Sequence, residues 1–406
     1  MENREERKRQ LKEKLSANID YSTERSDAEM QELIDEMLIK ESKEMPMTLT
    51  ERRQLRKELF DAIRKLDVLQ ELVDDPYITE IMINGPDCVF IEQNGRLFRS
   101  DLRFESREKL ENVIQQIVSD CNRVVNEASP IVDARLRNGA RVNVVLSPVA
   151  LNGPIVTIRR FPEKPIMMQD LISYGSISKE VCEWLSRLVQ AKYNIFISGG
   201  TGSGKTTFLN ALSYYIPKEE RIITIEDSAE LQILGIPNLV RMETRNANVE
   251  GCREITIRDL IKTSLRMRPD RIIVGEVRGG EAFDMMQCLN TGHDGSMSTG
   301  HANSSGDMLS RLENMILMGM EIPLAAIKQQ IASGIDIIVH LGRLRDKSRK
   351  VLEIMEVEGF AEGEIALNPL YRFVETGEDA EGRIMGALQK RGELKYVEKL
   401  QSAGLQ

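Results

Sequence analysis

The chain has 406 residues, of which 41% are hydrophobic, 29% are charged and 5% are aromatic, and its formal net charge is −9 at pH 7. This length allows two or three domains with their own cores, and the composition is that of an ordinary soluble globular protein. No run approaches about eighteen consecutive apolar residues and the N-terminus lacks a signal-peptide core, so we expect a cytoplasmic protein. Basic and acidic residues are interleaved, which argues against nucleic acid as the main partner.

Five cysteines are scattered singly along the chain: Cys88, Cys121, Cys182, Cys252 and Cys288. This spacing forms neither a CxxC metal motif nor a disulfide framework. We therefore expect reduced, mostly buried thiols and no zinc site.

Residues 1–70 are predicted to form a helical N-terminal module. The first fifteen or so residues are a mixed-charge run, either a solvated helix or a disordered arm. Ser26 with Glu29 and Thr48 with Glu51 match the capping-box pattern, and each pair is followed by apolar residues at helical spacing. The module is either a structural cap or a docking surface for a partner.

Residues 71–160 are predicted to form an α/β domain. Short β-like segments with Asn-Gly turns begin near Ile78, a helix follows over residues 110–118, and further strands continue to residue 160. Arginines gather on the later strands: Arg135, Arg137, Arg141, Arg159 and Arg160. They are either ordinary surface residues or groups that contact phosphate across a domain boundary.

A linker over residues 161–169, which contains Pro162 and Pro165, leads to a domain predicted over residues 170–360. Strands alternate with helices throughout this domain, as in a parallel α/β sheet. Residues 361–406 are predicted to be a C-terminal tail with a short helix near residues 388–400.

A phosphate-binding loop is the strongest motif in the chain. Gly199, Gly204, Lys205 and Thr206 fill the pattern GxxxxGK[ST] between an apolar strand and a helix, the order that phosphate binding requires. Lys205 is expected to reach the β- and γ-phosphates, Thr206 to bind Mg²⁺, and the helix dipole to attract the anion. The alternative is a glycine-rich turn. The predicted nucleotide-binding loop consists of Gly199, Gly200, Thr201, Gly202, Ser203, Gly204, Lys205, Thr206 and Thr207.

Carboxylates follow two of the predicted strands. Ligands of parallel α/β sheets bind at the carboxyl ends of strands. Glu226 and Asp227 follow the strand at residues 221–225, and Glu230 lies one turn further on. One carboxylate is expected to hold magnesium through water, Glu226 being the candidate, while another orients the nucleophile.

Two carboxylates flank another predicted strand, one before it and one after it. Asp270 precedes the apolar run 272–274 and Glu276 follows it. At roughly 3.3 Å per residue the two lie well over about 10 Å apart, so only Glu276 faces the nucleotide. We expect Glu276 to polarise the attacking water or to hold the magnesium shell; the alternative is a carboxylate at a helix start.

Two histidines flank a short strand, His293 before it and His301 after it. Eight residues apart and without nearby cysteine, they are a poor zinc site. An imidazole at the γ-phosphate would sense that phosphate or take part in catalysis; the alternative is structural hydrogen bonding.

Together these motifs resemble the superfamily of secretion and pilus-assembly ATPases, which includes the type II and type IV secretion motors. Four signatures carry the resemblance: GGTGSGKTT at 199–207, TIEDSAEL at 224–231, RIIVGEVR at 271–278 and GHDGSMSTGHAN at 292–303. The wider sequence is most similar to the CpaF-like branch, which powers tight-adherence pili, and the likeness spans about residues 72–371.

The resemblance implies an α/β fold with a RecA-like P-loop NTPase domain, preceded by a smaller PAS-like α/β domain and the helical module. It implies an ATPase that uses ATP and Mg²⁺ and assembles as a homohexameric ring. Arg159 and Arg160 match the family's interdomain arginines, and Arg278 lies in its GEVR motif. The partners implied are inner-membrane platform proteins of a pilus or secretion system, to which the cytoplasmic ring attaches peripherally. The tetracysteine zinc module of some branches is missing.

Three classes of function fit these observations. The first is a motor that powers pilin assembly or, alternatively, type IV secretion. The second is a nucleic-acid translocase, which would require basic loops with aromatic residues. Aromatic residues are only 5% of the chain, which argues against this class. The third is a P-loop signalling or scaffold protein without turnover, which the full set of carboxylates argues against.

Overall fold

The computed structural model describes residues 10–12, 14–15, 26–44, 47–93, 95–121, 123–136, 138–160, 164–245 and 253–405. The chain divides into two compact units, Met1–Pro162 and Glu163–Gln406. Within the described ranges, no helix combines the length and the apolar character needed to cross a bilayer. Cys182 and Cys288 are buried and Cys88 and Cys121 half-buried, while Cys252 lies outside the described residues.

The first unit begins with the predicted helices, α2 (Asp27–Glu44) and α3 (Leu49–Arg64). Both capping boxes form: the carboxylate of Glu29 accepts from the backbone N–H of Ser26 at 2.7 Å, and that of Glu51 accepts from Thr48 at 2.8 Å. The two helices bury a small apolar cluster, as amphipathic helices do. Leu11 and Leu15, from the helical residues 10–12 and 14–15, are buried in the same cluster, so this part of the N-terminal run is neither a solvated helix nor a disordered arm. The prediction of a helical module is confirmed here, and its role as cap or docking surface stays a prediction.

A six-stranded antiparallel sheet forms the rest of the first unit, in the order β3-β2-β1-β6-β5-β4. Its elements are α4 (Leu69–Asp74), β1 (Ile78–Asn84), β2 (Val89–Gln93), β3 (Arg96–Arg99), α5 (Arg107–Asp120), β4 (Ile131–Arg135), β5 (Arg141–Val145) and β6 (Ile155–Arg159). Alternate residues of the central strands, such as Ile81, Val142 and Ile158, share one core with the apolar side of α5. The other face of these strands therefore carries the intervening, more polar residues.

The second unit contains a nine-stranded sheet in the order β15-β14-β13-β12-β7-β11-β10-β8-β9. Six neighbouring strands are parallel, and β13, β14 and β15 add an antiparallel edge. The elements are α6 (Met168–Ser173), α7 (Lys179–Gln190), β7 (Ile195–Gly199), α8 (Lys205–Ser213), β8 (Ile222–Glu226), β9 (Leu239–Glu243), α9 (Ile257–Ser264), β10 (Arg271–Val274), α10 (Glu281–Leu289), β11 (Met297–Gly300), α11 (Ser305–Gly319), α12 (Leu324–Gly334), β12 (Ile337–Arg343), β13 (Arg349–Ala361), β14 (Glu364–Glu378), β15 (Ile384–Lys390) and α13 (Glu398–Ser402).

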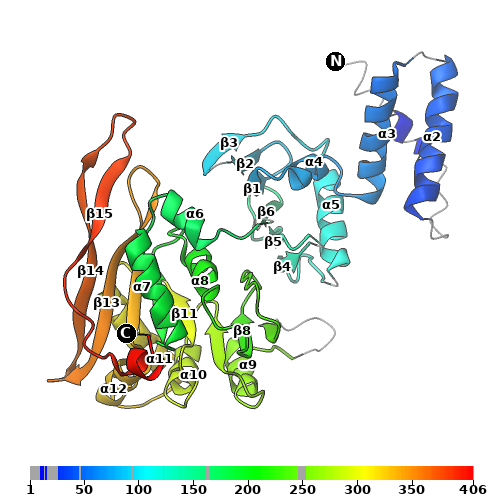
Figure 1. Ribbon diagram of the computed structural model, residues 1–406. Helices are drawn as coiled ribbons and strands as arrows, with labels where there is room; N and C mark the ends of the chain where they lie inside the picture. The colour runs from blue at the N-terminus through cyan, green and yellow to red at the C-terminus, as the bar shows by residue number, and fades with distance from the viewer. Residues whose placement is uncertain are drawn as a thin grey trace. The chain divides into compact units, whose positions relative to one another are not determined.

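Helices cover both faces of this sheet. Helices α6, α7 and α8 share one core with Ile195 and Ile197 of β7, whereas Phe196 joins the core of α9 to α12 on the other face. Figure 1 shows the two helical layers on either side of the strands. Central strands buried on both faces must be apolar throughout, which explains the continuous runs seen in the sequence.

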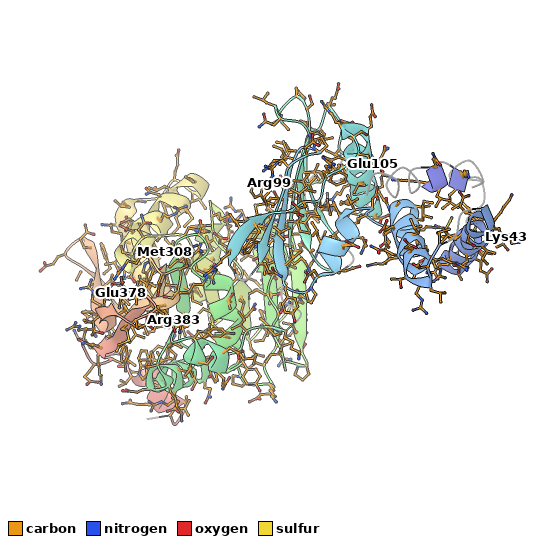
Figure 2. The ribbon with its side chains drawn as sticks, turned by 90° about the horizontal axis from the view of Figure 1, so that it is seen from above. Lys43, Arg99, Glu105, Met308, Glu378 and Arg383 are labelled. Atoms are coloured by element: carbon orange, nitrogen blue, oxygen red, sulfur yellow. The ribbon has the colours of Figure 1, made fainter. Side chains whose placement is uncertain are left out.

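The chain after residue 360 belongs to this unit, so the prediction of a separate tail from residue 361 is wrong. Strands β14 and β15 extend the sheet, and residues 384–390, part of which was expected to be helical, form β15. The error has a physical cause: of the seven residues of β15 only Ile384 is buried, so an edge strand leaves little alternation to detect. Glu378 and Arg383 mark the end of this hairpin in Figure 2.

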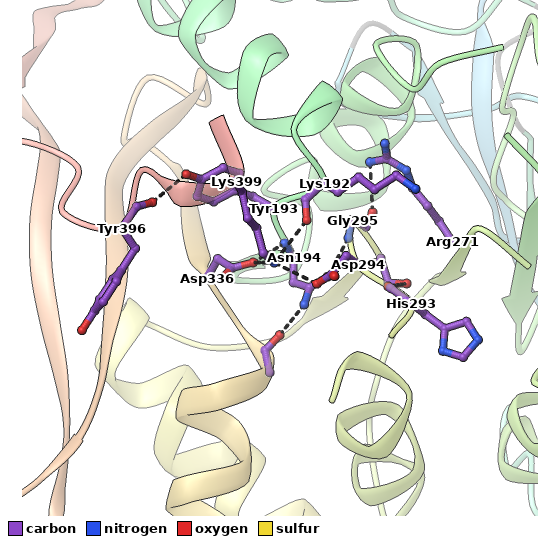
Figure 3. A network of polar contacts seen from close by, with 12 residues as sticks. Lys192, Tyr193, Asn194, Arg271, His293, Asp294, Gly295, Asp336, Tyr396 and Lys399 are labelled. Atoms are coloured by element: carbon purple, nitrogen blue, oxygen red, sulfur yellow. Dashed lines mark hydrogen bonds and ion pairs between the residues drawn. The ribbon is translucent and has the colours of Figure 1, made fainter. Parts of the chain in front are cut away.

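Polar contacts tie the C-terminal residues to the amino ends of the parallel strands (Figure 3). The ammonium of Lys399 lies 2.7 Å from the carboxylate of Asp336, just before β12, and 2.9 Å from that of Asp294, before β11. Asp336 also accepts from the backbone N–H of Asn194, before β7, at 2.7 Å. One lysine thus connects three strand starts at the sheet edge opposite the phosphate-loop sequence.

Candidate active site

The glycine-rich segment forms a tight loop between β7 and α8. Gly199 and Gly204 have positive φ angles of 157° and 94°. A Cβ on Gly199 would lie 2.5 Å from the carbonyl oxygen of Leu341 and 2.6 Å from Oγ of Ser203, so only glycine fits there. The loop leads directly into α8, whose first backbone N–H groups have no partner within the helix. The nine residues of the predicted nucleotide-binding loop run from the end of β7 to the first turn of α8.

The sheet brings the other predicted residues to this loop. Strands β7, β11, β10 and β8 are neighbours and run parallel, so the residues at their carboxyl ends meet at one edge. His301 follows β11, Glu276 follows β10 and Glu226 ends β8. Asp270 lies at the opposite edge, where its carboxylate accepts from the backbone N–H of Arg221 at 2.7 Å. The two carboxylates therefore lie at opposite edges of the sheet, and the role of Glu276 toward a nucleotide stays a prediction.

A chain of polar contacts joins three of these side chains. The ammonium of Lys205 donates to the carbonyl oxygens of Gly199 and Gly200, each at 3.1 Å, and lies 3.3 Å from Nδ1 of His301. Nε2 of His301 lies 2.9 Å from Oε1 of Glu276. An ammonium can only donate, so Nδ1 accepts and the ring proton sits on Nε2, facing the carboxylate.

Electrostatics support this assignment of the proton. Burial, and then the positive charge of Lys205, lower the pKa of His301 against the opposing effect of Glu276. Burial likewise lowers the pKa of Lys205, while Glu276 acts to raise it. His301 is accordingly a neutral imidazole near pH 7 that accepts a hydrogen bond from Lys205 and lies next to the carboxylate of Glu276.

Arg278 extends the contacts on the far side of Glu276. Its guanidinium donates to Oε2 of Glu276 at 2.8 Å and lies 3.8 Å from Oδ2 of Asp227. Arg278 thus holds Oε2 of Glu276 by a hydrogen bond, and His301 lies beside Oε1. The GEVR sequence places the arginine two residues after the glutamate, close enough for this contact.

Glu226 is buried at the end of β8, with 3% of its surface exposed. Its Oε2 accepts from the backbone N–H groups of Glu230 and Leu231 at 2.6 and 2.8 Å, and its Oε1 has no hydrogen-bond partner within the described chain. A Cβ on Gly275 would lie 2.9 Å from Cγ of Glu226, so this glycine leaves room for the side chain. Burial raises the pKa of Glu226 to about 7.

Three of the predicted arginines form a row on the sheet of the first unit. Arg135 stands opposite Arg141, Arg141 opposite Arg159, and Arg159 opposite Glu80, across β4, β5, β6 and β1. Directly opposed residues project from the same face, here the face away from the α5 core. Arg135 also donates to the carbonyl oxygen of Gly139 at 3.1 Å, and Arg141 lies 3.7 Å from the carboxylate of Asp133. Three guanidinium groups side by side still repel one another, so this row is suited to an anion.

Arg160 does not join that row. Its guanidinium donates to the carbonyl oxygen of Asp75 within the first unit, and its backbone N–H donates to Thr79. Adjacent residues of an extended strand point to opposite faces, so Arg159 and Arg160 diverge. The expectation that they act together does not fit this geometry, and Arg137 lies outside the described residues.

His293 is also separated from the phosphate loop. It precedes β11, at the amino edge of the sheet, and lies near Asp294, Gly295 and Arg271 in Figure 3. The structure therefore brings only His301 of the predicted pair to Lys205. The reason is the direction of β11, whose two ends lie at opposite edges of the sheet.

One polar pair was missed by the sequence interpretation. Nδ1 of His340, on β12, lies 2.8 Å from the hydroxyl of Ser198 on β7, directly beneath the loop, and both residues are buried. Burial lowers the pKa of His340. A histidine inside the apolar run IDIIVHL was the available signal, because a polar residue in a doubly buried strand needs a partner.

The burial of Glu226 leads to a pH prediction. Between its ordinary pKa of 4.5 and its folded pKa of about 7, the folded state binds more protons than the unfolded state, so stability falls as pH rises through this window. Glu226→Gln keeps the acceptor and removes the charge. Its free energy of unfolding, from urea titrations without nucleotide, should nearly match wild type at pH 4.5 and exceed it by about 2–3 kcal/mol at pH 8.

The matched control is Glu219→Gln, which removes an exposed carboxylate. It should show no such pH-dependent gain. An equal difference between Glu226→Gln and wild type at both pH values would show that Glu226 is ionised throughout.

Comparisons with known proteins agree with this geometry. The family described as "Type II/IV secretion system protein" matches residues 63–383. A relative from Mycobacterium tuberculosis H37Rv is 35% identical over 293 residues, 71% of this chain and 83% of that protein. Conjugal transfer protein TrbB of Rhizobium radiobacter is 32% identical (73% and 91% covered), and type IV secretion system protein VirB11 of Brucella suis is 31% identical (68% and 84% covered).

Two solved structures share the fold. The ATPase DotB of Legionella pneumophila has a TM-score of 0.50 at 20% identity, covering 71% of this chain and 79% of that one. The pilus retraction motor PilT with bound ADP has a TM-score of 0.50 at 16% identity, covering 84% and 86%. The predicted α/β class with a RecA-like domain is confirmed. Since the family pattern spans most of the sequence and several relatives exceed 30% identity over most of their length, the chain belongs to the type II/IV secretion system protein family.

Proposed function

We propose that the protein is a Mg²⁺-dependent ATPase, the motor of a secretion or pilus-assembly system. The observation that carries the proposal is the contact chain from the phosphate loop through Lys205 and His301 to Glu276. It joins a phosphate-binding cation to a carboxylate that can orient water, as phosphoryl transfer requires.

The residues present suit ATP with magnesium. The loop curls so tightly that a Cβ at Gly199 would not fit, and the helix dipole of α8 favours an anion such as phosphate at its N-terminus. Magnesium usually binds through substrate phosphates, water and only one or two carboxylates. Thr206 and, through water, Glu226 would hold it, and Glu226 has an oxygen without a hydrogen-bond partner within the described chain. The bound ion would neutralise charge on the phosphates.

The chain's own residues have distinct roles in this proposal. Lys205 turns from the loop carbonyls to the β- and γ-phosphates. Glu276 polarises the attacking water, with one carboxylate oxygen held by Arg278 and the other next to His301. His301 touches both the lysine and the glutamate and so responds to the γ-phosphate. Glu230 stays a candidate through its place beside Glu226, whereas His293 has no role supported by its position.

Glu276→Gln tests the catalytic role. The change keeps size and removes the charge, so ATP should still bind while hydrolysis drops by at least about 10²-fold, as for loss of a positioned base. Phosphate release and equilibrium ATP binding are the measurements. Asp270→Asn, at the opposite edge of the sheet, is the control and should retain activity. If Glu276→Gln lost ATP binding and turnover to the same extent, the main role of Glu276 would be to bind the metal and not to activate water.

The arginine row suggests that the first unit completes the site. We propose that Arg159, with Arg135 and Arg141, contacts phosphate when neighbouring chains assemble into a homohexamer. The like-charged row supports an anionic ligand, and a guanidinium binds phosphate oxygens in a forked geometry that lysine cannot reproduce. Arg160 belongs to the proposal only if it leaves the Asp75 carbonyl.

Assembly can be tested through activity. Specific ATPase activity should rise with protein concentration, in step with the mass found by light scattering. Arg159→Lys should slow hydrolysis at every concentration despite keeping the charge. Arg107→Lys is the control, since Arg107 pairs with Glu111 on α5 at 2.8 Å. A fully active monomer, or Arg159→Lys at wild-type activity, would contradict the proposal.

Membership of the family supports a proposal about the partners. We propose that the ring works in the cytoplasm against platform proteins of the inner membrane and uses no nucleic acid. The CpaF-like resemblance favours pilin assembly, and the similarity to VirB11 favours substrate export as the alternative. Capture from detergent-solubilised membranes, with and without ATP, distinguishes them: pilin machinery supports the first, and a type IV secretion channel supports the second.

A further inference from the structure

A row of polar side chains crosses the strands β11, β7, β12, β13 and β14 just before the phosphate loop. Residues that are direct neighbours across a pleated sheet project from the same face. The neighbours in this row are, in order, Gly300, Ser198, His340, Glu353 and Arg372. Ser198 follows Phe196 by two residues, so the row lies on the face of the sheet that α9 to α12 cover.

The middle of this row is buried although it is polar. Ser198, His340 and Glu353 all lie in the interior, and Nδ1 of His340 is 2.8 Å from Oγ of Ser198. Burial lowers the pKa of His340, whereas Glu353 and a hydrogen bond with the backbone of Asn303 act to raise it. Because a neutral imidazole has one acceptor and one donor, it can satisfy Ser198 and Asn303 together.

This bridge joins two segments of the candidate site. Ser198 directly precedes the phosphate loop, and Asn303 follows His301 by two residues. The two segments also touch each other, because the carbonyl oxygen of Gly199 accepts from the backbone N–H of Ala302 at 3.4 Å. The imidazole therefore connects the start of the phosphate loop with the segment that carries the histidine beside Lys205.

Glu353 holds the same segment two residues further on. Its Oε1 accepts from the backbone N–H of Ser305, the first residue of α11, at 2.9 Å, and its Oε2 lies 3.9 Å from the guanidinium of Arg372. A Cβ on Gly300 would lie 2.8 Å from Cε of Met308, so α11 packs tightly over the row. The segment after β11 is thus held from the strands beneath it at residues 303 and 305.

We propose that His340 is a positioning residue for phosphoryl transfer: through its bridge it holds His301 beside Glu276. The inference rests on the proposed function and adds a buried residue from outside the four signature motifs. Misplacement of a reacting group by about 1 Å can cost about 10²-fold in rate. Loss of the bridge should therefore slow the chemical step, while ATP binding by the phosphate loop stays nearly intact.

The test measures kcat and KM for Mg·ATP on the full chain, with radiolabelled ATP so that slow hydrolysis can be followed. His340→Leu removes both hydrogen-bonding groups at similar size, and it should lower kcat about 10- to 100-fold and change KM less than about threefold. His340→Gln keeps an acceptor and a donor, so it should restore most of kcat. Ser198→Ala breaks the same bridge by a smaller change and should also lower kcat, which keeps the test available if His340→Leu does not fold.

A double-mutant cycle with His301→Ala separates positioning from a general loss of structure. Once the imidazole of His301 is absent, His340→Leu has no side chain to position and should lower kcat less than about twofold further. Ile338→Val is the matched control, since Ile338 is buried two residues earlier on the same face of β12. It should lower stability and leave kcat unchanged.

Two results would overturn the positioning role alone: an equal loss of kcat in both backgrounds, or wild-type kcat in both His340→Leu and Ser198→Ala. Wild-type kcat in His301→Ala would remove His301 from the proposed function, and this inference with it. Wild-type protein that does not hydrolyse ATP would overturn the proposed function itself.

Discussion

The buried ammonium of Lys205 is the interaction on which the candidate site depends. Two loop carbonyl oxygens and the neutral ring of His301 accept hydrogen bonds from this ammonium at the carboxyl edge of the sheet. The other ring nitrogen of His301 lies next to Glu276. Each partner comes from a different segment, so the arrangement exists only because β7, β11 and β10 are parallel neighbours. A shift of one strand would separate the phosphate-binding cation from the carboxylate that orients water.

Much of this arrangement could be predicted from local sequence. The capping pairs Ser26–Glu29 and Thr48–Glu51 fix helix starts by short-range chemistry, and strand length alone separates Asp270 from Glu276. The remainder depends on pairing between distant segments. The contact of His301 with Glu276 requires knowing that β11 lies beside β10, and the row of Arg159 with Arg141 requires the register of two strands.

The errors have the same origin. Closeness in sequence pairs His293 with His301, yet the two residues lie at opposite ends of β11 and so at opposite edges of the sheet. The sequence of the C-terminal strands resembles that of a tail because an exposed edge needs few apolar residues. After these strands, Lys399 binds Asp336 and Asp294 at the amino edge of the sheet. In the second unit, the C-terminal residues connect the amino ends of the parallel strands. The residues at the carboxyl ends of these strands form the candidate active site.

The rate of phosphate release from Mg·ATP in Lys205→Ala tests the central claim most directly. Lys192→Ala is the comparison, because Lys192 lies before β7 at the opposite edge and its ammonium is 3.7 Å from Glu220. Loss of the positioned cation should remove nearly all turnover, at least about 10²-fold, while Lys192→Ala stays active and both variants remain folded by circular dichroism. Wild-type turnover in Lys205→Ala would contradict the account.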